Sequence, residues 1–270
     1  MRAIWTSAAF TCLMAAGLGA QTSDAAWLQR CDREDWGGDR ERFCEVRVSG
    51  FRPGRGSIVV VPGTNGGASI EGWDRDSVSV HARIQANAEE IDDARALARE
   101  VDVRRNGNTI EADGPEPGRR EGWSVQFVIY VPRRSNIEIE THNGPLSVRN
   151  VTGTMDLYTQ NGPLSLSGVA GDVKARTQNG PLSVHLEGDR WTGAGLDAEA
   201  QNGPVTLFIP DNYSAELETG TINGPMTSDF PITVTLNGRM KSRITTRLGN
   251  GGAPVRVVTS NGPVSLRRSE

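Results

Sequence analysis

Carboxylates recur at one place in a repeated pattern, and they are the residues best suited to chemistry. Counted back from successive Asn-Gly-Pro tripeptides, Glu138, Glu140 and Asp156 occupy matching positions, and Asp197 and Glu199 occupy them again further along. Glycoside hydrolysis uses two clustered carboxyl groups, one as acid and one as base or nucleophile. A carbohydrate-active enzyme is therefore one hypothesis for this chain.

Two cations fall among these carboxylates. Lys174 and Arg176 hold the same repeat positions as the acidic residues, and opposite charges on neighbouring strands stabilise a sheet. A solvated ladder of ion pairs explains the same residues, so we favour a non-catalytic protein. The chain also lacks an Asp-x-Asp-x-Asp or Gly-Gly-x-Gly-x-Asp loop for calcium. We expect no metal and no cofactor.

The sequence does not indicate a serine that acts as a nucleophile. Ser147, Ser165, Ser183 and Ser265 recur, but only His185 lies close to one of them in the chain. A Ser-His-acid triad needs a base and an orienting acid beside the nucleophile. We expect these serines to belong to strands.

Three aromatic residues are the candidate ligand contacts: Tyr158, Trp191 and Phe208. Aromatic rings offer flat apolar faces that can stack on sugar rings. Trp191 lies in the insertion from Gly188 to Gly195, which we expect to project from the fold as recognition loops do. A tryptophan that caps its own loop is the alternative.

The Asn-Gly-Pro tripeptide is an internal repeat. It begins at Asn143, Asn161, Asn179, Asn202, Asn223 and Asn261, with spacings of 18, 18, 23, 21 and 38 residues. Residues 65–70 resemble a degenerate earlier copy. Because Asn and Gly tolerate positive φ, we interpret the tripeptide as a structural turn. Stacked asparagines could also form an amide ladder. A linear ligand-binding array at the turns is the functional alternative.

Each repeat contains two alternating apolar segments. One follows the tripeptide, as in Leu146-Ser147-Val148, and one precedes it, as in Met155, Leu157 and Thr159. A period of two indicates strands with one face inward. Strands this short need neighbours to bury that face, so repeats that stack in chain order predict a continuous interior. The expected fold is an all-β, parallel β-solenoid or β-helix with coils of about 18–23 residues and two short strands each.

The N-terminal half shows other patterns. Alternating runs at 58–61 and 78–80 predict strands, as does 123–132. Residues 86–101 have apolar residues at helical spacing and predict the one helix of note.

The start of the chain is typical of a secretory signal. Arg2 precedes an apolar stretch from Ala3 to Leu18 that is too short and too rich in small residues to span a membrane. We place the signal peptide at residues 1–20 and expect export to the periplasm, cell surface or medium, without a transmembrane segment. The net charge is −4 and the mean hydropathy is −0.42, which gives no reason to expect a nucleic acid partner.

Two cysteines remain after signal removal. In an oxidising compartment, Cys31 and Cys44 with twelve residues between them predict a disulfide. A redox or metal pair would need closer spacing or partner ligands. We therefore divide the chain into a signal peptide, a disulfide-closed extension at 21–44, and a solenoid domain at 45–266.

The order of segments resembles the adhesin-like domain family of bacteria, a group of exported β-solenoid domains of unknown biochemical function. Residues 127–132, the run 137–144 and the coil 169–173 carry the resemblance, which covers about residues 45–266. It implies an envelope or surface role and no catalytic residues. This chain departs from the family in the Pro after each Asn-Gly and in the Cys31–Cys44 extension.

The sequence thus predicts a non-catalytic, exported, adhesin-like protein that binds an envelope, glycan or protein ligand through its solenoid surface. A carbohydrate-active enzyme on the same scaffold is the first alternative. A periplasmic structural or signalling accessory protein is the second.

Overall fold

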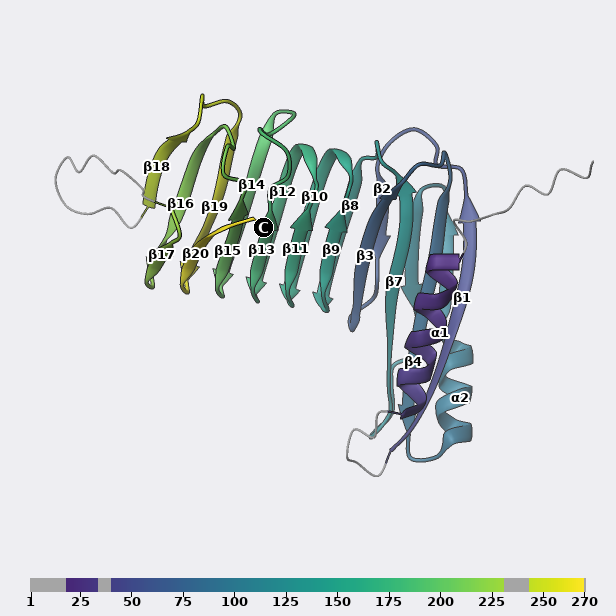
Figure 1. Ribbon diagram of the computed structural model, residues 1–270. Helices are drawn as coiled ribbons and strands as arrows, with labels where there is room; N and C mark the ends of the chain where they lie inside the picture. The colour runs from purple at the N-terminus through teal and green to yellow at the C-terminus, as the bar shows by residue number, and fades with distance from the viewer. Residues whose placement is uncertain (1–17, 34–39, 231–242, 270) are drawn as a thin grey trace, which may run out of the picture.

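A computed structural model describes residues 18–33, 40–230 and 243–269 of the chain (Figure 1). Two ten-stranded sheets make up most of it. The helices are α1 (Leu18–Arg33) and α2 (Ile91–Glu100). Sheet A runs in the order β1 (Glu41–Phe51), β4 (Val78–Ala88), β7 (Gly122–Pro132), β3 (Gly66–Trp73), β9 (Leu146–Arg149), β11 (Leu164–Ser167), β13 (Leu182–His185), β15 (Val205–Ile209), β20 (Val264–Arg268) and β17 (Met226–Ser228).

The other sheet, sheet B, faces sheet A across the core. Its order is β18 (Arg243–Leu248), β16 (Ala215–Asn223), β19 (Pro254–Asn261), β14 (Gly195–Asn202), β12 (Ala170–Asn179), β10 (Thr152–Asn161), β8 (Ile137–Asn143), β2 (Ile58–Val61), β6 (Thr109–Asp113) and β5 (Asp102–Asn106). A strand of sheet B, a corner and the next strand of sheet A form one coil. Coils stack through parallel pairing, as in β10 on β12 and β11 on β13. The body is therefore β-solenoid-like.

The interior of the stack is formed by the residues that alternate inward. Leu146, Leu164 and Leu182 lie in one register on sheet A, and all are buried. Met155 and Val173 lie in one register on sheet B, likewise buried. Since each coil is too thin to bury these side chains alone, the neighbouring coils supply the contact area.

The corners carry an asparagine ladder. The Nδ2 amide of Asn161 donates to Oδ1 of Asn143 at 2.9 Å, and Asn143 donates to Asn65 at 3.1 Å. The ladder continues through Asn179, Asn202, Asn261 and Asn223. All the predicted turn residues therefore lie at corners, and Asn65 of the degenerate copy at 65–70 lies at the first corner, directly before β3.

The glycine of each corner is required for a different reason from the one expected. Of the corner asparagines and glycines, only Gly262 has a positive φ. Instead, a Cβ added at Gly162 would lie 2.1 Å from the carbonyl oxygen of Gly144, and one at Gly180 would lie 2.1 Å from that of Gly162. Backbones of stacked coils approach too closely here for any side chain.

The N-terminal part departs from the predicted solenoid. Strands β1, β4 and β7 pair antiparallel, and β5 pairs antiparallel with β6. The long strands β1, β4 and β7 continue sheet A beyond the stack as an extension that hangs below it in Figure 1. The expectation of a purely parallel solenoid over 45–266 is therefore wrong for β1, β4 and β5, and for β18, which pairs antiparallel with β16. The 11-residue strands β1, β4 and β7 can bury a face with antiparallel neighbours and a helix.

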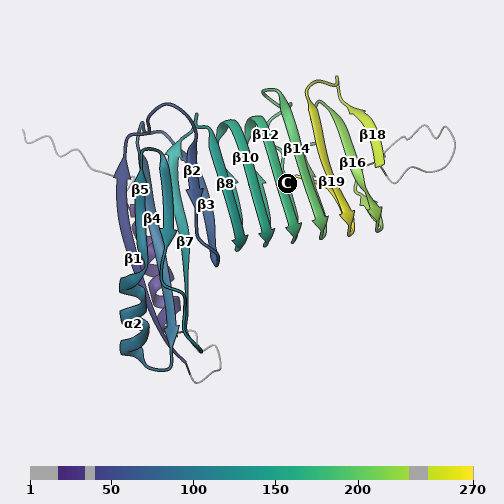
Figure 2. The same ribbon diagram turned by 180° about the vertical axis from the view of Figure 1, so that it is seen from behind.

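Two helices cover opposite faces of this extension (Figures 1 and 2). The predicted helix at 86–101 is shorter, because Ala86 to Ala88 belong to β4 and α2 begins at Ile91. Helix α1 was not predicted. Asp24 anchors it: its carboxylate contacts His81 Nδ1 at 2.5 Å and Arg83 Nε at 2.9 Å, and all three side chains are buried. A disulfide joins Cys31 at the end of α1 to Cys44 in β1. The predicted signal peptide lies outside the described residues up to position 17.

Candidate ligand-binding face

The outward side chains of sheet B form three parallel columns. Parallel pairing in register sets them one strand spacing apart. The first column is Glu138, Asp156, Lys174, Asp197, Arg256 and Glu218; the second is Glu140, Tyr158, Arg176, Glu199, Val258 and Gly220. The third is formed by the residues before the corner asparagines, which include Gln160, Gln178, Gln201 and Ser260.

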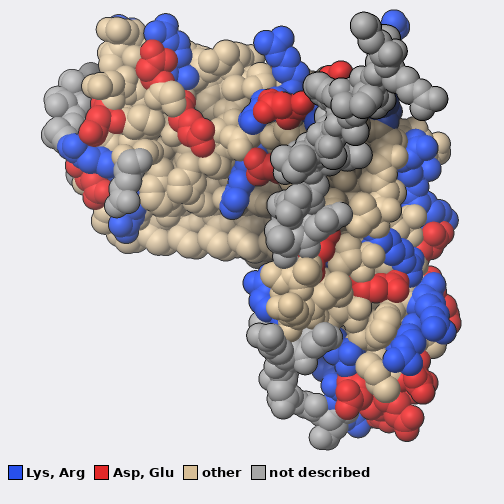
Figure 3. Space-filling view, turned by 45° about the vertical axis from the view of Figure 1, so that its right-hand side comes forward, with Lys and Arg blue, Asp and Glu red and all other residues tan. Residues whose placement is uncertain are grey.

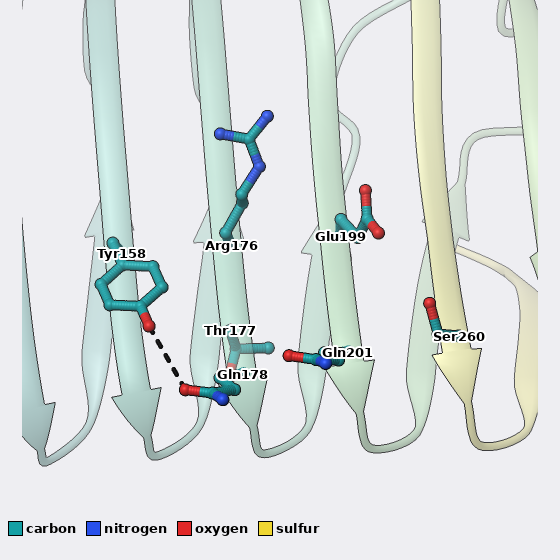
Figure 4. A pocket seen from close by; sticks show the side chains of 7 residues that line it. All are labelled: Tyr158, Arg176, Thr177, Gln178, Glu199, Gln201 and Ser260. Atoms are coloured by element: carbon teal, nitrogen blue, oxygen red, sulfur yellow. Dashed lines mark hydrogen bonds between the residues drawn. The ribbon is translucent and has the colours of Figure 1, made fainter.

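A shallow depression lies where the second and third columns meet. It has a volume of about 390 Å³ and is lined by Tyr158, Arg176, Thr177, Gln178, Glu199, Gln201 and Ser260 (Figure 4). The Tyr158 hydroxyl donates to Gln178 Oε1 at 3.4 Å. The aromatic ring thus lies at one end of a row of amide, guanidinium, carboxylate and hydroxyl groups that crosses β12, β14 and β19. This set can stack on an apolar ring face and hydrogen-bond to its hydroxyls.

Arg256 organises the charges beside this depression. Its Nη1 lies 2.5 Å from Asp197 Oδ1 and 3.1 Å from Glu199 Oε2. Burial acts to lower the pKa of Arg256, but its hydrogen bonds and ion pairs with the two carboxylates outweigh burial and raise the pKa above its usual value. Asp197 and Glu199, the distal pair of the candidate catalytic cluster, are therefore both engaged by one guanidinium.

The other candidate carboxylates are separate from this pair. Glu138, Glu140 and Asp156 are exposed on β8 and β10, and Asp156 lies in register with Lys174. Among the described residues, no three His, Cys, Asp or Glu side chains form a group that could hold a metal ion. Nor does any described helix have the length and apolar character needed to cross a membrane.

Trp191 does not project, contrary to the expectation for its insertion. It is 5% exposed, and its indole Nε1 donates to the carbonyl of Gly171 at 3.0 Å. The insertion folds back over the stack, because burying the large indole stabilises the loop more than exposing it would. Trp191 is therefore part of the core and cannot serve as a surface ligand contact.

Phe208 lies on the opposite side of the body from Tyr158. It points outward from β15 in sheet A and stacks on His185 of β13, with ring centroids 4.0 Å apart and planes 11° apart. Burial against this neighbour lowers the pKa of His185. The structure thus does not bring the three predicted aromatic contacts together.

The recurring serines form a column on that same face of sheet A. Ser147 Oγ donates to Ser69 Oγ at 2.9 Å, and Ser147, Ser165 and Ser183 share one register. In Figure 3, charged side chains are sparse over the middle of the stack and gather toward the lower end of the extension. The middle of sheet A therefore presents a column of hydroxyl groups beside the Phe208–His185 pair, whereas sheet B presents the charged columns and Tyr158.

The sequence did not predict that two residues, Arg256 and Val258, lie in the columns on sheet B. Arg256 and Val258 lie in the last repeat, which was expected to follow the repeat of Asn223 in the stack. The structure instead places that last repeat between β14 and β16. The acidic positions Asp197 and Glu218 offered a signal, because a cation between them relieves their repulsion.

Fold and face together define a β-solenoid-like protein with a flat polar surface. The family model described as Toastrack DUF4097 matches residues 125–267, which is more than half of the chain. The chain belongs to this family, and its adhesin-like resemblance is confirmed. No curated protein matches the chain in sequence.

Solved structures give more distant similarities. A candidate cell adhesion protein of Clostridium sporogenes is 11% identical, with a TM-score of 0.43, over 85% of this chain and 100% of that one. A candidate adhesin of Bacteroides fragilis is 10% identical, with a TM-score of 0.29, over 83% and 97%. A candidate adhesin of Parabacteroides distasonis is 10% identical, with a TM-score of 0.33, over 82% and 97%. Membership of the family rests on the Toastrack match.

Proposed function

We propose that this protein is an exported, non-catalytic binding protein of the bacterial envelope, adhesin-like, which holds a linear polysaccharide on the outer face of sheet B. The observation that carries the proposal is the depression beside Tyr158, where a half-buried aromatic ring on β10 is followed by Gln178 on β12 and Gln201 on β14. Aromatic stacking supplies affinity, and the amides supply hydrogen bonds to hydroxyl groups.

The regular spacing of the face favours a polymer over a small molecule. Gln160, Gln178 and Gln201 repeat at one position on adjacent strands, and strands lie about 4.8 Å apart. This spacing is close to the length of one pyranose unit, so a chain laid across the strands meets an equivalent amide at each sugar. The depression is also shallow and open, as a binding surface for a polymer must be.

Catalysis is the weaker hypothesis for the same face. Both Asp197 and Glu199 are ion-paired with Arg256, whereas glycoside hydrolysis needs one carboxyl group that carries a proton. An enzyme would release reducing ends from a bound polysaccharide, and Glu199→Gln would abolish that release without unfolding the protein.

Glycan-array binding by the purified protein tests the proposal. Tyr158→Ala should weaken binding about tenfold, the loss expected for an aromatic contact in a recognition site. Phe208→Ala is the matched control, because it removes an outward aromatic ring from sheet A and should leave binding unchanged. Equal losses in the two variants, or no glycan bound, would contradict the assignment to sheet B.

Location is tested by protease digestion of intact producing cells compared with lysed cells. Digestion on intact cells is expected for an adhesin. Protection until lysis would instead support the periplasmic structural or signalling accessory role and direct the search to periplasmic partners.

A further inference from the structure

The last repeat in the chain is not the last coil in the stack. Strand β19 lies between β14 and β16 in sheet B, and β20 lies between β15 and β17 in sheet A. In Figure 2, β19 occupies this place between the strands that precede it in the chain. Residues 254–268 thus fill a two-strand slot whose two walls, β14/β15 and β16/β17, are made by earlier parts of the chain.

Both walls pair with the inserted segment as ordinary coils pair with each other. Asn261 Nδ2 donates to Asn202 Oδ1 at 2.9 Å, and Asn223 Nδ2 donates to Asn261 Oδ1 at 2.8 Å. In the backbone, Val205 N donates to the carbonyl of Pro263 at 2.9 Å, and Val264 N donates to that of Pro225 at 3.0 Å. The slot therefore accepts a β-strand pair by edge pairing on both sides.

Charge makes the slot selective. The first-column residue of each wall is acidic, Asp197 on one side and Glu218 on the other. Arg256 lies between them, with Nη1 2.5 Å from Asp197 and Nε 3.6 Å from Glu218. A segment with an acidic residue at this position would place three like charges in a row, which is unfavourable.

Shape adds a second element of selectivity. Val258 is fully buried although it points outward, and it lies in register with Gly220, which has no side chain. The other coils place Glu140, Tyr158, Arg176 or Glu199 at this second-column position. The slot thus fits a segment with a cation and then a small apolar residue two positions later, as residues 254–268 have.

The link into the slot is glycine-rich. Residues 249–253 connect β18 to β19, and Gly249, Gly251 and Gly252 have positive φ values of 49°, 76° and 143°. These glycines let the link fold back across the end of β16, and they also let it extend. The link is therefore suited to act as a hinge.

We propose that the slot is a complementation site that also takes residues 254–268 from a second copy of this chain, so that two copies exchange their C-terminal coils. The exchanged form makes the same pairings and ion pairs as the closed form. Its formation is therefore governed by protein concentration and by the hinge rather than by new contacts.

Two single-cysteine variants with different tags test the exchange when they are exported together. Thr206 of β15 lies in register with Ser265 of β20, and both point outward. A Thr206→Cys copy and a Ser265→Cys copy should form a covalent heterodimer that carries both tags. The double variant Thr206→Cys/Ser265→Cys should close internally in the monomer.

The control pairs Thr206→Cys with Ser69→Cys, which lies on β3 in the same sheet, far from the slot. A heterodimer in this pair at the same yield, or no heterodimer in the test pair while the double variant closes, would overturn the proposal.

Size-exclusion chromatography gives a second readout without cysteines. Deletion of Gly251 and Gly252 should raise the dimer fraction, because a shortened hinge strains the closed form. Arg256→Glu is the control and should leave the dimer fraction unchanged at equal protein concentration, because Arg256 makes the same ion pairs in the closed and the exchanged form. A dimer fraction that the glycine deletion does not raise would also overturn the proposal.

Discussion

At the scale of single residues, the two neighbours Leu164 and Ser165 have opposite roles. Leu164 is 1% exposed between Leu146 and Leu182, whereas Ser165 lies on the outer face of sheet A. One step along the strand therefore separates a buried position from one on the outer face. A charged side chain should lower the free energy of unfolding much more at Leu164 than at Ser165.

Leu164→Asp should unfold the chain or destabilise it by more than about 4 kcal/mol, because it buries an unpaired carboxylate. Ser165→Asp should be tolerated, since its carboxylate reaches water. Thermal denaturation of both variants measures the difference. Similar melting temperatures for the two would contradict the register of the stack.

A second residue-level test concerns the corner glycines. Gly162→Ala should cost about 1–3 kcal/mol, the range for forced overpacking, because its Cβ would meet the Gly144 carbonyl oxygen at 2.1 Å. Gly54→Ala is the control, as its nearest contact would be 3.5 Å away. Urea unfolding of both variants gives the comparison, and equal losses would show that close stacking is not the constraint.

His185 gives the fold a pH dependence. Burial lowers its pKa in the folded state below the usual 6.5, so the unfolded chain binds the proton more readily. The contribution of His185 to stability is complete above pH 6.5 and is lost as the pH falls toward the lowered pKa. Proton NMR titration measures the pKa. His185→Phe keeps a ring on Phe208 and should remove this part of the pH dependence of the urea midpoint.

At the scale of elements, α1 is held by few but specific contacts. Asp24 binds His81 and Arg83, and the Cys31–Cys44 disulfide ties the end of the helix to β1. The sequence predicted the disulfide from export and spacing, but not the helix, since residues 21–44 have no clear apolar periodicity. Its position depends on a buried ion pair with residues almost sixty positions away.

The double variant Cys31→Ser/Cys44→Ser should lose about 3 kcal/mol in the chain-entropy description of loop closure. Hydrogen exchange should quicken in α1 and β1 while the coils from β8 to β15 stay protected, because these coils do not contact the disulfide. Uniformly faster exchange would mean that α1 supports the whole body. Unchanged exchange would mean that the Asp24 contacts suffice.

At the scale of the whole molecule, sequence reasoning succeeded where structure is local. Strand alternation and the Asn-Gly-Pro period predicted the inward residues, because a period of two and a repeated corner leave few other solutions. It failed at the antiparallel extension and at the order of the last coils. Both depend on pairing between segments that are distant in the chain. The backbone edge of a parallel coil offers the same hydrogen-bonding groups to any strand, so the repeat pattern does not say which strand pairs there.

The candidate site was predictable only in part for the same reason. Tyr158 and the carboxylate columns follow from alternation, but Trp191 lies inside because its insertion folds back, and Arg256 reaches the face from a repeat that is displaced in space. The spacing of residues along the chain predicts neither the folding back of the Trp191 insertion nor the position of the last repeat inside the stack.

The displaced coil also bears on how the protein is made. Because a ribosome makes the chain from its N-terminus, residues 254–268 are made only after the strands β14 to β17 that lie on both sides of them in the stack. A solenoid stacked in chain order can add each coil as it is made. Here β14 and β16 cannot both reach their final pairing until β19 has been made. A chain cut short within residues 254–268 loses an interior layer rather than an outer coil, so the loss leaves unpaired strand edges on both sides of the gap.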